Sequence, residues 1–153
     1  MFIEMELSEL CRTTQMNAVV LREMNGELRQ FPIFIGVYEA EALEMALHGK
    51  AAPRPLTHDL ILNVIRELGG ELRRVVLDRL EDNVFYCKLD VGMPDNSTIW
   101  VDCRPSDAMV LACRVGASIY ADDTVLEEAN AQPQEEEEPV DDEPVDDEPE
   151  DGE

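Results

Sequence analysis

The sequence predicts an α+β domain in which a mixed, mainly antiparallel sheet packs against about three helices. Three observations predict this class. Apolar and polar residues alternate in several short stretches, which is the period of half-buried strands. Short spans of turn-forming residues join several of these stretches, which favours hairpins and therefore antiparallel pairing. Three other stretches place apolar residues three to four positions apart, which is typical of amphipathic helices.

The first third of the chain predicts three strands. Residues 3–7 alternate between apolar and polar side chains, and residues 17–23 contain an apolar run. Asn25-Gly26 then predicts a tight hairpin, because both residues tolerate positive φ. Residues 28–35 return as a third strand, and Pro32 indicates an edge strand or a strand end.

Three amphipathic segments predict helices. They span residues 38–47, 60–68 and 105–115, and each is followed within two positions by a glycine that can end it. Thr57 is placed to cap the second helix, because its hydroxyl can accept from amides two or three residues on. Pro105 falls in or near the first turn of the third helix, where its missing N–H costs little.

The second half of the chain predicts more strands. Residues 72–77, 84–91 and 98–101 follow one another through turns, and residues 118–120 form a short last strand. Residues 122–129 predict a final helical turn or two. Residues 1–131 are therefore expected to form a single compact domain.

The charge balance is strongly acidic. The 153 residues include 12 Lys or Arg and 35 Asp or Glu, a net charge of −23. Residues 132–153 hold 13 of the acidic residues and no basic ones, which leaves 22 acidic and 12 basic residues, a net of −10, in residues 1–131. An acidic surface repels phosphate backbones at long range, so charge alone does not predict non-specific binding to nucleic acid.

The last segment, residues 132–153, repeats the unit Pro-Val-Asp-Asp-Glu from Pro139 and again from Pro144. It has too little apolar surface to offset the entropy of ordering, so we expect a disordered acidic tail. The tail either contacts a protein partner, competes for a basic site, or only keeps the chain in solution.

Cysteine usage and hydropathy bear on the cell compartment. Cys11, Cys87, Cys103 and Cys113 form no CxxC pair, which favours buried reduced thiols over zinc or disulfides. The N-terminus has no basic segment followed by a long apolar run, and no stretch approaches the roughly 20 apolar residues that span a bilayer. We therefore expect a cytoplasmic protein that does not enter the membrane.

Two polar corners stand out, at residues 53–59 and 102–107, and each places Arg-Pro shortly before a predicted helix. A helix N-terminus favours a bound phosphate, and arginine can clamp that phosphate with two hydrogen bonds. Nearby carboxylates can hold a divalent cation, and a histidine can act as general base. If the two corners lie at the same edge of the sheet, they would form a site that cleaves phosphodiesters.

A structural interpretation of the same residues stays open. Asp59 and Asp107 would favour the dipoles of their own helices. Arg54 and Arg104 would pair with nearby carboxylates, and His58 would be a hydrogen-bonded structural histidine.

Several motifs together resemble the bifunctional nuclease domain family across nearly all of residues 1–130. The two most specific are Thr-His-Asp within residues 53–59 and Arg-Pro-Ser-Asp-Ala at residues 104–108. The others are Phe-Pro-Ile-Phe-Ile-Gly at 31–36, Glu-Ala-Glu-Ala at 39–42 and Phe-Tyr at 85–86. The resemblance implies a compact α+β domain, a homo-oligomer, and a nuclease that acts on DNA and RNA with a divalent metal ion.

The resulting hypothesis assigns a role to each corner residue. The assigned catalytic residues are His58, Asp59 and Asp107; the phosphate-binding residues are Arg54, Thr57, Arg104 and Ser106; and the ligands of Mg²⁺ or Mn²⁺ are Glu39, Asp102 and Asp107. The alternative is an oligomeric binding or regulatory module without enzymatic activity, in which the corners are an inter-subunit polar network.

Overall fold

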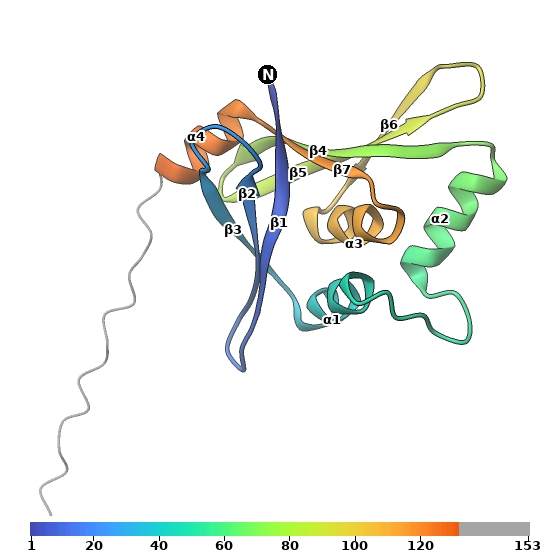
Figure 1. Cartoon of the computed structure of the whole chain (residues 1–153), viewed down its shortest axis with the longest axis horizontal. Helices are drawn as coiled ribbons and strands as arrows, with labels where there is room; N and C mark the ends of the chain where they lie inside the picture. Colours follow the sequence, from blue (N-terminus) through green and yellow to red (C-terminus); the bar gives the residue numbers. More distant parts are fainter. Residues whose placement is uncertain (132–153) are drawn as a thin grey trace, which may run out of the picture.

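The computed structural model describes residues 1–131, in which seven strands form one sheet and four helices pack against it (Figure 1). The strands are β1 (Phe2–Arg12), β2 (Asn17–Glu23), β3 (Gln30–Ile35), β4 (Glu71–Glu81), β5 (Val84–Gly92), β6 (Thr98–Cys103) and β7 (Ser118–Asp122). The helices are α1 (Val37–Leu47), α2 (Thr57–Glu67), α3 (Pro105–Val115) and α4 (Asp123–Ala131). The α+β prediction is confirmed, whereas the predicted acidic tail, residues 132–153, lies outside the described residues.

The sheet is mixed and mainly antiparallel, as predicted. Its strand order is β3-β2-β1-β7-β4-β5-β6. Five neighbouring pairs are antiparallel, and only β4 and β7 run parallel. The first three strands and the strands β4 to β6 each follow one another directly, and β7 lies between these two groups.

The turn between β2 and β3 is longer than the predicted Asn25-Gly26 hairpin. The strands end at Glu23 and resume at Gln30, and the backbone reaches positive φ at Gly26 (85°) and at Leu28 (57°). Glu23 and Arg29 close the loop, because the amide of Glu23 donates to the carbonyl of Arg29 at 2.9 Å. The amide of Arg29 donates in return to the Glu23 carboxylate at 2.7 Å. This reciprocal pairing moves the closing point of the loop away from Asn25-Gly26.

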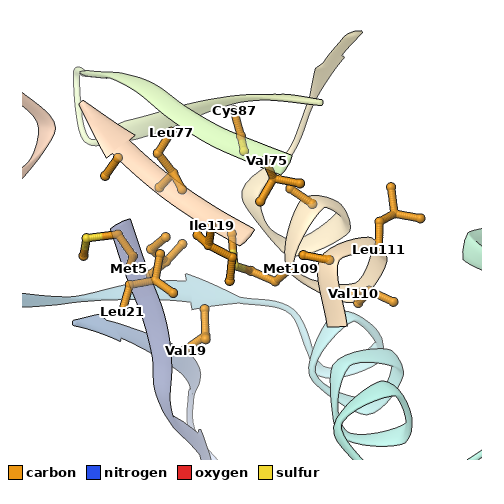
Figure 2. Close-up of a cluster of buried hydrophobic side chains, with 14 of the residues drawn as sticks. Met5, Val19, Leu21, Val75, Leu77, Cys87, Met109, Val110, Leu111 and Ile119 are labelled. Atoms are coloured by element: carbon orange, nitrogen blue, oxygen red, sulfur yellow. The ribbon is translucent and has the colours of Figure 1, made fainter. Parts of the chain in front are cut away.

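The core lies between the sheet and the helices α1 and α3, which cover one of its faces (Figure 1). Alternation along each strand decides which side chains enter it. Figure 2 shows side chains from both layers that belong to one buried cluster, such as Met5 of β1, Val75 of β4 and Met109 of α3. Each fully buried side chain of this size contributes roughly 1.5–3 kcal/mol through removal of apolar surface from water.

The segment after β7 is helical as predicted, and its helix is slightly longer than the predicted turn or two. Helix α4 has nine residues and buries Val125 and Leu126 completely. Its first residue, Asp123, accepts a hydrogen bond from Arg29 Nη2 at 2.9 Å. Arg29 also pairs with the buried Glu23, so the β2–β3 loop holds the start of α4.

Among residues 1–131, no helix is both long enough and apolar enough to cross a bilayer.

Candidate active site

Four polar side chains from three helices and one helix boundary meet at the N-terminus of α3. His58 Nε2 of α2 lies 2.9 Å from Asp107 Oδ1 of α3. Arg104, which directly precedes α3, donates from Nε to Asp107 Oδ2 at 2.8 Å and from Nη2 to Oδ1 at 3.1 Å. Its remaining nitrogen, Nη1, donates to Glu39 Oε1 of α1 at 3.3 Å. The two sequence corners and the first turn of α1 therefore form one hydrogen-bonded cluster.

The local sequence explains the position of each group. Pro105 starts α3 and leaves Arg104 in an extended conformation, with φ −73° and ψ 147°. This places the Arg104 side chain just outside the helix, where it reaches back to Asp107 in the first turn. Glu39 occupies the first turn of α1, and a Cβ at Gly36 would overlap its carboxylate. A glycine at position 36 is thus required for Glu39 to lie where it meets Arg104.

The electrostatics of the cluster favour charged side chains. Partial burial opposes ionisation of Asp107, but hydrogen bonds from Arg104 and His58 outweigh it and lower the pKa of this carboxyl below its ordinary value. Asp107, and to a smaller extent Glu39, raise the pKa of the Arg104 guanidinium. Asp107 is therefore a carboxylate at neutral pH. The Arg104 side chain keeps 64% of its surface exposed, so a ligand can reach it.

A cleft of about 910 Å³ lies beside the cluster. Glu39, Asp102, Arg104, Ser106 and Asp107 are among its polar lining residues, and apolar side chains from β3, β5 and β6 line much of the rest. These apolar residues include Phe34, Phe85, Tyr86 and Val101. A mostly apolar cleft with a few convergent polar groups is the usual form of a ligand site.

The curl of the sheet forms this cleft. In the strand order, β3 and β5 are separated by four strands, yet the rings of Phe31 and Phe85 stack with their centroids 5.4 Å apart. The sheet therefore bends round on itself until its two ends approach each other. Helix α3 begins at the opening between them, which places Arg104 and Asp107 in the cleft.

The structure brings together only some of the predicted site residues. Glu39, His58, Arg104 and Asp107 are in contact. Asp102 and the buried Ser106 line the cleft beside them. Asp59 does not line the cleft; it lines a separate small hollow with His58 and Arg114, where its Oδ1 is 3.8 Å from Nε of Arg114. Among the described residues, Arg54 and Thr57 are exposed and have no hydrogen-bonding or charged partner for their side chains.

Thr57 does not cap α2 as predicted. It is the first residue of the helix, and the preceding Leu56 occupies the cap position with φ −79° and ψ 175°. The Asp59 carboxylate takes over part of the capping, because its Oδ2 accepts from the Leu56 amide at 3.0 Å. A charged carboxylate is a stronger acceptor than a hydroxyl, and the helix consequently begins one residue earlier than a Thr57 cap would allow.

The predicted ligands of a metal ion, Glu39, Asp102 and Asp107, all line the cleft, but they do not form a metal-binding group. Asp102 lies opposite Lys88 in the β5–β6 pairing and makes no hydrogen bond with Glu39 or Asp107. Glu39 and Asp107 are both held by the Arg104 guanidinium, which occupies the position between them. Within residues 1–131, no group of three or more His, Cys, Asp or Glu side chains is arranged to hold a metal ion. This arrangement of side chains does not fit Mg²⁺ or Mn²⁺.

Sequence reasoning missed the apolar wall of the cleft. Its residues lie within the motifs at 31–36 and 85–86, so the signal was present as aromatic residues in stretches assigned to strands. Phe34 is 66% exposed, although a strand residue of this type is more often buried. Only the curl of the sheet shows that the two motifs face one cleft.

A family model described as the bifunctional nuclease domain matches residues 19–134, which include the whole cluster and cleft. The chain belongs to the bifunctional nuclease domain family. The matched range covers most of the sheet and all of the helices α1 to α4. The fold and the polar cluster described above are thus features of a member of this family.

Known relatives of this bifunctional nuclease domain protein include bacterial and plant proteins. An uncharacterized protein of Mycobacterium tuberculosis is 42% identical over 111 residues, which are 72% of this chain and 65% of the relative. A protein named bifunctional nuclease 1 from Oryza sativa subsp. indica is 27% identical over 100 residues, which are 64% of this chain and 30% of the relative. A bifunctional nuclease from Oryza minuta matches to the same extent. The chain thus spans less than two thirds of the length of each of these relatives.

Proposed function

We propose that this family member is a nuclease that hydrolyses phosphodiester bonds of DNA and RNA at the cleft beside Arg104. The observation that carries the proposal is that His58 and Arg104 both contact Asp107, a carboxylate that lines the polar end of a large cleft. The named activity of the rice relatives supports the same reaction class.

Arg104 is the group proposed to bind the scissile phosphate. A guanidinium has five N–H donors, and three of them are used by Asp107 and Glu39. Two donors remain for phosphate oxygens on a side chain that is mostly exposed. The free amides at the N-terminus of α3 lie beside it and favour an anion. The hydroxyl of Ser106, in the first turn of α3, is a further candidate donor.

His58 is the group proposed to accept the proton of the attacking water. When a neutral imidazole donates from Nε2 to Asp107 Oδ1, its Nδ1 carries the free lone pair. Asp107 then holds the ring in this tautomer and stabilises the imidazolium that forms after proton transfer. The water oxygen bonds to phosphorus, and the departing alkoxide leaves as an alcohol with a proton from solvent.

Dependence on Mg²⁺ or Mn²⁺ stays a prediction. Because the carboxylates near the cleft do not fit either ion as they stand, the proposed steps use only His58, Arg104 and Asp107.

The second candidate function is a binding or regulatory module without catalysis. One observation favours it: the cluster ties three helices together, because Arg104 links α3 to α1 and Asp107 links α3 to α2. A network of this kind also has a purely structural value.

A cleavage assay distinguishes the two candidates. The full chain is incubated with end-labelled single-stranded DNA and RNA in Mg²⁺, Mn²⁺ or EDTA. The test variant is His58→Gln, and the matched control is His48→Gln, because His48 is the other histidine and is exposed at the end of α1. We expect His58→Gln to lose about 10²-fold or more in rate, as is typical for loss of a general base. His48→Gln should cleave like the wild type.

Each outcome of this assay decides between the candidates. Cleavage by the wild type that is lost with His58→Gln supports the nuclease and its site. Equal cleavage by all three proteins would point to a contaminant and reject the site. No cleavage by the wild type with any ion or with EDTA would favour the binding module. Unaltered cleavage in EDTA would reject the metal prediction alone.

A further inference from the structure

Strand β6 is one of the two edge strands of the sheet. It pairs with β5 over six residue pairs without a bulge, and no described strand pairs with its other edge. Its central residues are apolar and exposed: Ile99 is 48% exposed, Trp100 47% and Val101 41%. An edge strand of this kind offers a row of unpaired N–H and C=O groups to another strand.

The opposite end of the sheet is protected. The edge strand β3 contains Pro32, which has no N–H to donate, and its neighbours Phe31 and Ile33 are buried. Helix α4 also packs against β3. The edge strand β6 has no proline, no lysine or arginine, no bulge and no covering helix among the described residues. Most of the devices that normally prevent edge pairing are therefore present at one end of the sheet and missing at the other, where Asp102 is the one charged side chain of β6.

We propose that β6 pairs antiparallel with β6 of a second copy of this chain, in the register centred on Trp100. In this register Trp100 faces the partner's Trp100, and Ile99 faces the partner's Val101. This inference does not depend on the proposed nuclease activity.

The faces of β6 limit the possible registers. Val101 and Ile99 lie opposite the core residues Leu89 and Val91, whereas Trp100 lies opposite Asp90 on the other face. Opposed residues of antiparallel strands point to the same face. The two-fold axis must therefore lie midway between one residue of β6 and the same residue of the partner strand. Of the registers that remain, only the one centred on Trp100 places every exposed apolar residue of β6 against another one.

Charge also favours this register. Asp102 would face the hydroxyl of the partner's Thr98, which can donate a hydrogen bond to the carboxylate. A register centred on Asp102 would instead place two carboxylates against each other, which is destabilising. The sequence Thr98-Ile-Trp-Val-Asp102 is thus self-complementary about its centre, as a symmetric dimer contact requires.

The pairing would bring the partner close to the candidate active site. In the same register, Cys103 lies opposite the partner's Ser97, next to Arg104. The partner's β5–β6 turn, residues 93–97, would then extend the wall of the cleft. In Figure 1 this hairpin projects beyond the helices, so its outer edge is open to a second molecule.

Sedimentation of the full chain between about 1 and about 100 µM tests the dimer, because this range covers the affinities of transient association. Trp100 is the only tryptophan, so its fluorescence reports on the contact directly. We expect the mass to rise from monomer to dimer and the Trp100 emission to shift to shorter wavelength over the same range. Ile99→Lys should remove both changes, and Phe34→Lys on β3 is the matched control that should keep them. Thermal unfolding verifies that both variants fold.

Crosslinking tests the register. Opposed Cα atoms of antiparallel strands are about 4.5–5.5 Å apart, which suits a disulfide. Under mild oxidation Trp100→Cys should crosslink to itself, as identified by the linked peptide, while Val101→Cys should not. A monomer at every concentration, or a dimer that survives Ile99→Lys, would overturn the proposal. Self-crosslinking of Val101→Cys without that of Trp100→Cys would overturn the register.

Discussion

His58 Nε2 lies 2.9 Å from Asp107 Oδ1, although 49 positions separate the two residues in the sequence. Arg104 holds the same carboxylate from the other side. Asp107 is therefore the centre of the cluster, and the roles of the two neighbours depend on it. Substitutions of His58, Arg104 and Asp107 should therefore affect different measured properties of the protein.

Arg104→Ala should weaken nucleic-acid binding without unfolding the protein. The guanidinium is mostly exposed, so its ion pairs contribute about 1 kcal/mol or less to stability. As a phosphate ligand, however, it should contribute about one unit to the slope of the logarithm of the association constant for nucleic acid against the logarithm of salt concentration. Binding of a single-stranded oligonucleotide, measured by fluorescence anisotropy across a salt series, gives both quantities. Arg22→Ala is the control, because Arg22 forms only a surface pair with Glu6. An unchanged slope for Arg104→Ala would remove Arg104 from the site.

Asp107→Asn should flatten the pH dependence of stability below about pH 5. The pKa of Asp107 is lowered in the folded state, so the unfolded chain binds more protons between the two pKa values. The stabilisation is complete above the unfolded value of about 3.9 and is lost as pH falls through the folded value. Urea unfolding at pH 7, 5, 4 and 3.5 measures this loss in the wild type, and Asp107→Asn should lack it. Glu127→Gln, at an exposed position of α4, should follow the wild type. Parallel curves for all three proteins would contradict the inferred ion pairing.

Arg29→Met should be strongly destabilising. Glu23 is only 3% exposed, and Arg29 supplies its charged partner at 2.7 Å. Hydrogen bonds from Arg29 are the main cause of the lowered pKa of Glu23. Loss of the partner leaves a buried charge unpaired, which costs roughly 3–5 kcal/mol in the free energy of unfolding. Arg22→Met, in an exposed pair, should cost about 1 kcal/mol or less. Chemical denaturation measures both, and equal losses would show that burial of Glu23 is not decisive.

Leu126→Ala should show that α4 belongs to the folded core. Leu126 is fully buried, and truncation of such a residue costs roughly 2–5 kcal/mol. Leu68 is 71% exposed at the end of α2, so Leu68→Ala should change stability by about 0.5 kcal/mol or less. Urea unfolding of the two variants provides the comparison. A loss below about 1 kcal/mol for Leu126→Ala would mean that α4 is only loosely attached.

Local patterns predict the elements of this fold well. Pro105 marks the start of α3, Pro32 lies on an edge strand, and Gly116 follows α3 with φ 68°. Each of these assignments depends on one residue and its nearest neighbours along the chain. The length of α4 does not follow from such a local pattern. The helix is held by burial of Val125 and Leu126 and by the contact between Asp123 and Arg29. Nine residues with two buried apolar positions give only a weak helical pattern.

The candidate site was predictable in part. The Arg-Pro corners, with His58 and Asp107, follow from the chemistry of their residues, and their meeting follows once the helices pack. Asp102 lines the same cleft as Glu39 and Asp107, but a shared ion would depend on distances between separate elements, which no sequence pattern encodes. The cleft depends on the curl of a seven-stranded sheet, which is the sum of small twists over many residues.

The position of β7 has a consequence for how the chain reaches this structure. Strands β1 to β3 and β4 to β6 are each joined by local turns, and β7 alone connects the two groups within the sheet. A nascent chain that ends before Ser118 therefore contains two separate three-stranded meanders. Each has an unpaired edge strand, β1 or β4, that pairs with β7 in the complete fold. Pairing residues 2–5 with residues 119–122 closes a loop of more than a hundred residues, which is a slow step. Folding on the ribosome should thus finish only after β7 emerges, and until then the unpaired edges of the half-sheets should favour aggregation.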